Sequence, residues 1–164
     1  MTARSKARKR ALDVLFEADQ RDSDPLATAR ERSGQALAPF AEYAFELVEG
    51  VTKHRTEIDS ILAEYAEGWT LDRMPAVDRA VLRIGTYELI FAPDVPDGVA
   101  ISEAVELARE LSTDASPGFV NGLLARVAAV VPARTAAPPV EVADPVDAGG
   151  SRDDLMSSRP PTAS

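Results

Sequence analysis

The spacing of apolar residues along the chain predicts a series of amphipathic helices. Across most of residues 4–131 apolar residues recur every three or four positions, which is the period of one helix face. No segment alternates between apolar and polar residues for long enough to predict a strand. The fold class is therefore expected to be all-α, with about seven helices near residues 4–22, 25–32, 40–51, 58–65, 75–91, 101–111 and 116–131.

Turn-forming residues mark the expected ends of these helices. Ser33 and Gly34 are expected to end the second helix, and residues 53–55 to interrupt the chain between the third and the fourth. Ser116 followed by Pro117 fits a helix N-cap followed by the first helical residue. Residues 77–91 have apolar side chains around much of the helix circumference, which predicts a central helix with neighbours on several sides.

The C-terminal segment, residues 132–164, differs from the rest of the chain. It holds six of the 12 prolines, has no aromatic residue and shows no apolar periodicity. Such a segment cannot bury enough surface to offset its chain entropy, so we expect it to be disordered. The predicted organisation is one helical domain over residues 1–131, whose first ten residues form a partly flexible basic arm, and a disordered tail.

The composition argues against catalysis and against a metal site. The chain has no cysteine and a single histidine, His54, and it has no glycine-rich phosphate loop. Glu103, Glu106 and Glu110 share one helical face, which we expect to be solvated. We therefore expect no enzyme, metal or cofactor. With no apolar run of membrane-spanning length and no signal peptide, a cytoplasmic protein without membrane contact is expected.

The distribution of charge changes the meaning of the formal net charge of −9. The first ten residues contain no acid and five basic residues, so the rest of the chain is even more acidic than the total. Clustered lysine and arginine side chains bind RNA phosphates, and arginine can also stack on unpaired bases. These residues are the first candidates for an RNA site: Arg4, Lys6, Arg8, Lys9 and Arg10.

A second unusual segment begins the last predicted helix. Asn121 and Gly122 would normally indicate a turn, yet the apolar stripe continues past them. Glycine inside a helix costs about 1 kcal/mol relative to alanine, which suggests close approach of a neighbouring helix or of a ligand backbone. For Phe119 a core position is favoured over a surface on which a base stacks.

Four stretches of the sequence together resemble the NusB family of transcription antitermination factors. They are the basic arm running into residues 11–16, then residues 77–89, 95–108 and 119–124. Their order and spacing match over nearly all of residues 4–131, and the combination is specific. The tail has no counterpart in this pattern.

The resemblance implies two packed helical subdomains and binding to the boxA element of rRNA leader transcripts. It also implies NusE, a small-subunit ribosomal protein, as a direct partner, and other Nus factors and RNA polymerase as indirect ones. Phe16 and Asp78 are the residues expected at the NusE surface. The RNA site implied by the family's motifs combines the basic arm with the segment before and within residues 119–122, which adds Ser116, Gly118, Phe119 and Asn121.

One departure from the family pattern and three alternatives remain. Family members often have a basic residue directly before the Phe-Val-Asn-Gly motif, where this chain has Gly118. We therefore expect the arm to carry more of the RNA contact here.

The alternatives are a helical adaptor or homodimer with the arm in its interface, the RNA-targeting domain of an rRNA cytosine methyltransferase, and a helix-turn-helix DNA-binding protein.

Overall fold

The computed structural model confirms the all-α fold class. It describes residues 2–35 and 41–136, and in these ranges it contains α-helices, one 3-10 turn and no strand. The tail is expected to be disordered, and its residues from 137 onward lie outside the described part of the chain. The elements are α1 (Ala3–Arg21), α2 (Pro25–Gln35), α3 (Glu42–Lys53), α4 (Arg55–Tyr65), η1 (Leu71–Arg73), α5 (Ala76–Phe91), α6 (Asp97–Leu111) and α7 (Ser116–Ala136).

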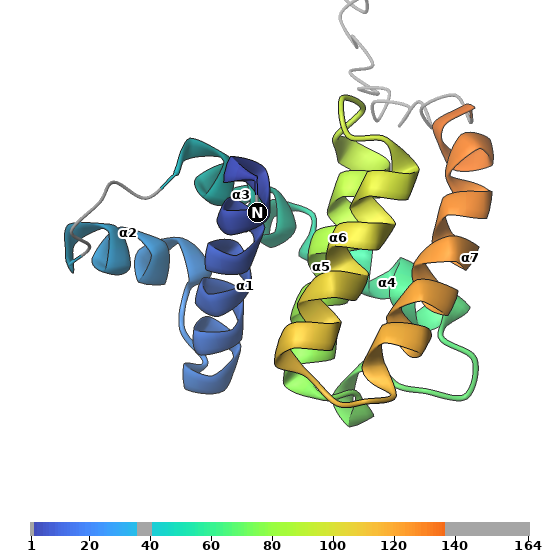
Figure 1. Cartoon of the computed structure of the whole chain (residues 1–164), viewed down its shortest axis with the longest axis horizontal. Helices are drawn as coiled ribbons and strands as arrows, with labels where there is room; N and C mark the ends of the chain where they lie inside the picture. The colour runs from blue at the N-terminus through green and yellow to red at the C-terminus, as the bar shows by residue number, and fades with distance from the viewer. Residues whose placement is uncertain (1, 36–40, 137–164) are drawn as a thin grey trace, which may run out of the picture.

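The helices form two groups that pack against each other (Figure 1). Helices α1, α2 and α3 pack together on one side, and α4, α5, α6 and α7 form the other group. Helix α5 joins the two groups because it contacts α1 and α3 on one side and α6 and α7 on the other. This position explains the apolar residues around its circumference, and the expected central helix is confirmed.

The expected break between the third and fourth helices is also confirmed. Helix α3 ends at Lys53 and α4 begins at Arg55, with His54 between them in a non-helical conformation. The imidazole of His54 stacks on the ring of Phe91 with 3.8 Å between ring centroids. The only histidine of the chain therefore packs against an aromatic ring at the end of α5.

Three predicted helix ends differ from the structure. Helix α2 continues through Gly34 to Gln35. Helix α7 contains Pro132 and continues to Ala136, five residues beyond the expected end. Ser116 is the first helical residue of α7 and not its cap, and its hydroxyl donates a hydrogen bond to Asp78 of α5.

Helices approach each other closely at Gly50 and Gly85, and not at Gly122. A Cβ atom on Gly50 would lie 2.2 Å from the ring of Tyr87, and one on Gly85 would lie 2.7 Å from Leu124. A Cβ on Gly122 would meet only Arg126, at an ordinary 3.7 Å. The expectation that Gly122 marks a close helix contact is therefore wrong. None of the helices in residues 2–35 and 41–136 is both long and apolar enough to cross a bilayer.

Candidate RNA interface

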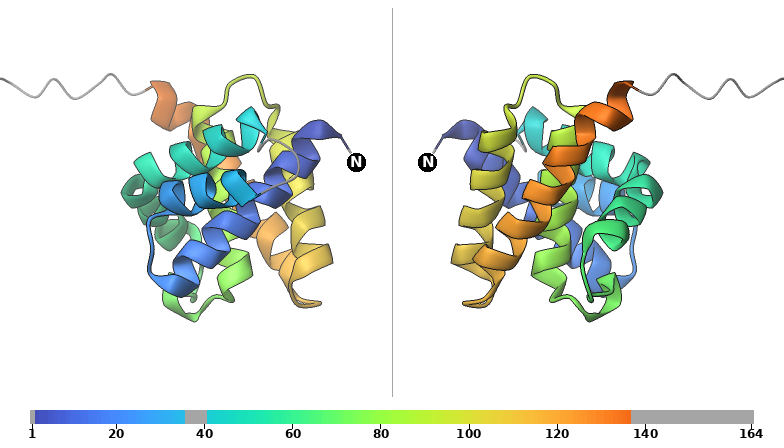
Figure 2. Two further views of the ribbon diagram at one scale, coloured as in Figure 1. Left: turned by 90° about the vertical axis from the view of Figure 1, so that its left-hand side faces the viewer. Right: turned by 90° about the vertical axis from the view of Figure 1, so that its right-hand side faces the viewer.

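The basic arm forms the first turns of α1. Helix α1 begins directly after Thr2, whose hydroxyl oxygen accepts a hydrogen bond of 3.0 Å from the backbone N–H of Ser5. This N-cap satisfies one of the backbone donors that every helix start leaves unpaired. The two views of Figure 2 show this end of α1 lying beside α6. The cap and the neighbouring helix together fix the direction in which the basic side chains point.

Acidic residues of the α5–α6 connection and of α6 hold part of this arm. Arg4 donates a hydrogen bond of 2.9 Å to Asp94, and Lys9 pairs with Glu110 at 2.5 Å. The hydrogen bond from Arg4 lowers the pKa of Asp94 below its ordinary value. The Ser5 hydroxyl donates a further hydrogen bond of 2.8 Å to Glu103.

These contacts correct the expectation that the acidic face of α6 is simply solvated. Two of its three glutamates, Glu103 and Glu110, bind residues of α1, and Glu106 pairs with Arg109 on its own helix. The acidic face of α6 therefore holds the basic arm in place against the second helical group.

Arg8 is buried, which argues against its predicted role as an RNA ligand. Only 2% of the residue is exposed, and its guanidinium donates two hydrogen bonds of 2.8 Å to the carboxylate of Glu88. The hydroxyl of Tyr43 donates to the same carboxylate. Burial, followed by this hydrogen bond to Glu88, raises the pKa of Tyr43 above its ordinary value. The Nε and Nη2 atoms of Arg8 cannot bind a phosphate without breaking this buried ion pair, so the main role of Arg8 is structural.

The other basic side chains of the arm point outward. Lys6 and Arg10 are exposed, and Lys9 is partly exposed. The side chain of Arg4 is 47% exposed, and its guanidinium lies 4.4 Å from the centroid of the Tyr43 ring. These four cations can meet phosphates without any unfolding.

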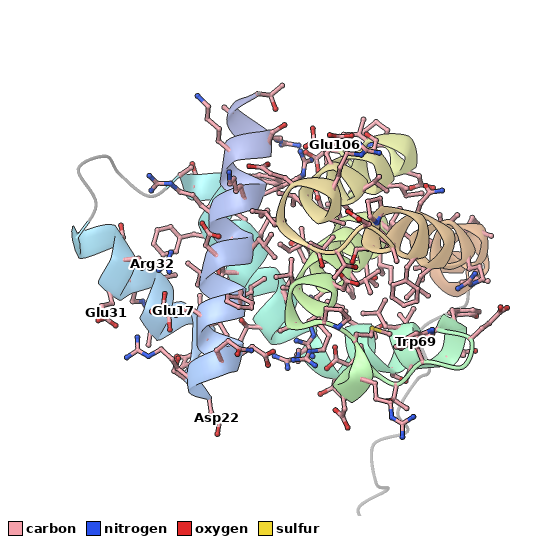
Figure 3. All side chains as sticks on the ribbon, turned by 60° about the horizontal axis from the view of Figure 1, so that its bottom comes forward. Glu17, Asp22, Glu31, Arg32, Trp69 and Glu106 are labelled. Carbon is pink, nitrogen blue, oxygen red and sulfur yellow. The ribbon has the colours of Figure 1, made fainter. Side chains whose placement is uncertain are left out.

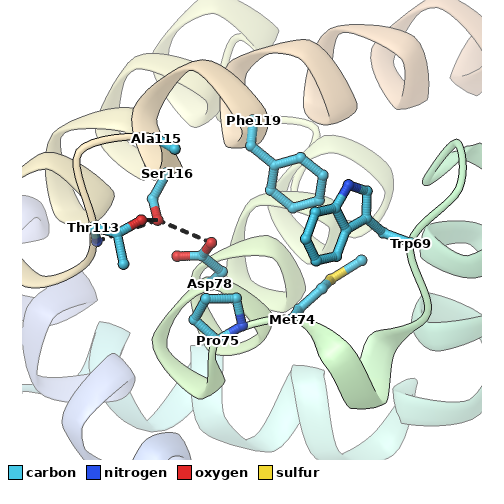
Figure 4. Close-up of a pocket in the computed structure, with 8 residues that line it drawn as sticks. All are labelled: Trp69, Met74, Pro75, Asp78, Thr113, Ala115, Ser116 and Phe119. Atoms are coloured by element: carbon cyan, nitrogen blue, oxygen red, sulfur yellow. Dashed lines mark hydrogen bonds between the residues drawn. The ribbon is translucent and has the colours of Figure 1, made fainter.

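The second predicted segment follows the C-terminal end of α6, around a pocket of about 270 Å³ (Figure 4). Phe119 is half-buried there, with its ring centroid 6.0 Å from that of Trp69 and an angle of 58° between the ring planes. Met74 and Pro75 complete the apolar wall. Gly118 and Asn121 are exposed on the first turns of α7. Phe119 therefore packs on the core with one part and lines a surface pocket with the other.

Asp78 and Ser116 are buried partners of each other. Asp78 is 3% exposed, and its carboxylate accepts hydrogen bonds from the hydroxyls of Ser112, at 2.6 Å, and Ser116, at 3.0 Å. This arrangement fixes the α6–α7 turn on the first turn of α5, where a negative charge also favours the helix dipole. Both side chains are almost fully buried and bound to each other, although they also line the pocket, and this argues against direct contact of either one with a partner. Phe16, the other predicted partner residue, is 37% exposed.

Helix α6 connects the surroundings of the two predicted RNA segments. Arg4 contacts Asp94 just before α6 and Lys9 pairs with Glu110 in its last turn, and the second segment begins shortly after this helix at Ser116. In Figure 3 Trp69 marks the edge of the molecule away from the first turns of α1, while Glu106 lies near the top with them. The same view shows Glu17 of α1 facing Arg32 of α2, a pair that joins these two helices. Trp69 is the functional candidate that the sequence analysis missed. The sequence signal for it is the only tryptophan of the chain, which stands among the small and polar residues 66–70. In the structure this side chain is 51% exposed in the turn after α4.

Comparisons with known proteins agree with the fold. Residues 5–129 match the NusB family. The transcription antitermination protein NusB of Kineococcus radiotolerans is 62% identical over 128 residues, which cover 78% of this chain and 94% of the relative. The corresponding protein of Arthrobacter sp. is 57% identical over 135 residues, covering 80% and 97%.

Solved structures of the same family superpose on this chain. T. maritima NusB does so with a TM-score of 0.71 and 36% identity, over 78% of this chain and 92% of that one. A structure of the antitermination factors NusB and NusE in complex with dsRNA has a TM-score of 0.69 and 32% identity, over 77% and 96%. Because residues 5–129 match the family model and the chain covers 94% and 97% of relatives to which it is 62% and 57% identical, the chain belongs to the NusB family.

Proposed function

We propose that this chain is a transcription antitermination factor that binds boxA RNA of rRNA leader transcripts together with NusE. The observation that carries the proposal is the set of outward-pointing cations on the first turns of α1: Arg4, Lys6, Lys9 and Arg10. Phosphate contacts from such a set supply most of the affinity for RNA without selecting its sequence. The role is one of binding, in keeping with the name of the relatives, which describes transcription antitermination.

In this proposal Arg8 supports the RNA site through its contacts inside the protein. Its ion pair with Glu88 fixes α1 against α5, and the Tyr43 ring is close to both cations, with its centroid 4.4 Å from the guanidinium of Arg4 and 5.6 Å from that of Arg8. Arg4 is one of the cations proposed to contact RNA, and the buried cluster of Arg8, Glu88 and Tyr43 positions it. This division of roles replaces the earlier assignment of all five basic residues to direct contact.

A second, weaker RNA contact is proposed at the start of α7. Gly118 and Asn121 are exposed there, and Phe119 lines the pocket beside Trp69. With glycine before Phe119, no cation stands at this position to bind a phosphate. Ser116 supports the segment from within through Asp78.

The NusE surface is proposed around Phe16 on α1. It is one of few large apolar side chains that the described residues leave exposed. Asp78 is left out of this surface because its carboxylate is buried and accepts two internal hydrogen bonds. Other Nus factors and RNA polymerase would be reached through this complex.

Binding of fluorescent boxA RNA, with and without NusE and at several salt concentrations, tests the proposal. Replacing both Lys6 and Arg10 by alanine should weaken binding and reduce the slope of log K against log salt by roughly two units, one for each lost phosphate contact. Arg21→Ala, which removes one cation from the far end of α1, is the control and should change little. Unchanged affinity and slope in the double variant would contradict the proposal. A shift of the monomer–dimer equilibrium in sedimentation would favour the homodimer alternative instead.

A further inference from the structure

A groove of about 400 Å³ lies between the first turn of α1 and the α5–α6 connection. Its apolar part is formed by Val95, Pro96 and Val99. Val99 is 42% exposed although it is a large apolar residue. The groove is continuous with the arm, because Arg4 and Arg8 line its other side. Its volume is within the range of sites that hold small organic ligands.

The groove is lined by charged groups of both signs. Arg4 and Arg8 supply N–H donors, and Asp94 and Glu103 supply carboxylate acceptors. Two cations against two carboxylates make the groove nearly neutral, so a phosphate gains little there. A neutral ligand that has both acceptors and donors on one edge fits this arrangement better, because it can satisfy both kinds of group.

Arg8 has donor capacity directed toward this groove. Its Nε and Nη2 atoms are bound to Glu88, while Nη1 lies 3.7 Å from Glu103, which is longer than a hydrogen bond. The side chain is only 3% exposed, so this donor is nearly desolvated and a ligand acceptor would gain a strong interaction with it. Glu103 is 25% exposed and has acceptor capacity beyond its bond to Ser5.

The wall formed by Arg4 suits a flat ligand. One face of its guanidinium lies over the Tyr43 ring, and the side chain remains half-exposed. A planar guanidinium held in this way offers a stacking surface for an unpaired base. The apolar floor at Val99 can cover the rest of such a ring.

We propose that the groove between α1 and the α5–α6 connection binds one unpaired base of the RNA that presents a carbonyl oxygen and an exocyclic amino group, as guanine does. The base stacks on Arg4, its carbonyl accepts from Nη1 of Arg8, and its amino group donates to Glu103. Base contacts of this kind select sequence, whereas the cations of the arm bind any backbone. The inference rests on the proposed RNA-binding function and adds sequence selection to it.

Binding of two short oligouridines, one with a central guanosine and one with inosine in its place, tests the groove in the full chain. Inosine lacks only the exocyclic amino group. We expect the wild type to prefer the guanosine RNA by about tenfold or more, the loss that one hydrogen bond to a charged acceptor produces. Glu103→Gln, and Val99→Trp, which fills the groove, should both bring this ratio close to one.

Two matched variants control for charge and bulk. Glu106→Gln removes the same charge from α6 outside the groove, and Leu111→Trp adds the same bulk at another exposed position of α6; both should keep the preference. If the wild type binds both RNAs equally, the proposed base site in the groove is wrong, while the proposed function is unaffected. A preference that survives in both groove variants would also overturn the base site. A wild type that binds neither oligouridine but still binds boxA RNA would overturn the groove alone, whereas a wild type that does not bind boxA RNA either would refute the proposed function as well.

Discussion

The guanidinium of Arg8 donates two parallel hydrogen bonds of 2.8 Å to the carboxylate of Glu88, 80 residues further along the chain. Both side chains are almost fully buried, with 3% and 1% of their surface exposed. The pair joins α1 to α5 and thus the two helical groups to each other. A buried ion pair adds little stability compared with an apolar pair, but losing one partner leaves the other charge buried and unpaired.

The main effect that we expect of Arg8→Ala is therefore a loss of stability. We expect the free energy of unfolding to fall by about 3 to 5 kcal/mol, because Glu88 remains as a buried charge. Urea unfolding followed by circular dichroism measures this change. Arg21→Ala, which removes an exposed pair with Glu17 on the same helix, should change the free energy of unfolding far less, because solvent screens this pair. Equal effects of the two substitutions would contradict the structural role of Arg8.

Gly118→Lys should strengthen RNA binding. The residue is exposed on the first turn of α7, and a Cβ there meets no atom within 4 Å, so a lysine fits without strain. One added phosphate contact should increase the salt slope by about one unit and the affinity several-fold. Gly34→Lys adds the same charge on α2, where a Cβ also meets open space, and should have a much smaller effect. If both lysines raise the affinity equally, the start of α7 is not part of the RNA site.

The sequence predicted the helices well because each has a regular apolar stripe that depends only on neighbouring residues. The break at His54 and the central position of α5 are visible in this local pattern. The site was predicted less completely because the decisive contacts are between distant residues. Arg8 lies in a run of similar cations, and only its partner Glu88 distinguishes it from them. Asp78 likewise looks like an exposed acid until the α6–α7 turn covers it.

The Arg4–Asp94 contact makes a prediction about pH. The hydrogen bond from Arg4 lowers the pKa of Asp94, so the folded protein holds this proton less tightly than the unfolded chain. Its contribution to stability is present above the unfolded pKa and is lost as the pH falls through the folded value. In an NMR titration the carboxyl carbon of Asp94 should shift at a pH below the ordinary aspartate range, and Arg4→Ala should move this midpoint upward. A midpoint that does not respond to Arg4→Ala would show that the two side chains do not pair in solution.

Two glycines inside helices should respond to alanine in opposite directions. In Gly50→Ala the new Cβ would lie 2.2 Å from the ring of Tyr87, so the ring and its stack on Phe91 must move. This overpacking should outweigh the gain of about 1 kcal/mol in helix propensity and leave a net loss of about 1 to 2 kcal/mol. In Gly122→Ala the nearest atom is Arg126 Nη1 at 3.7 Å, so the propensity gain remains and the protein should become more stable by up to about 1 kcal/mol. Denaturant midpoints of the two variants measured side by side test this contrast. A loss of stability in Gly122→Ala would mean that a helix or ligand does approach this position after all, as the sequence pattern first suggested.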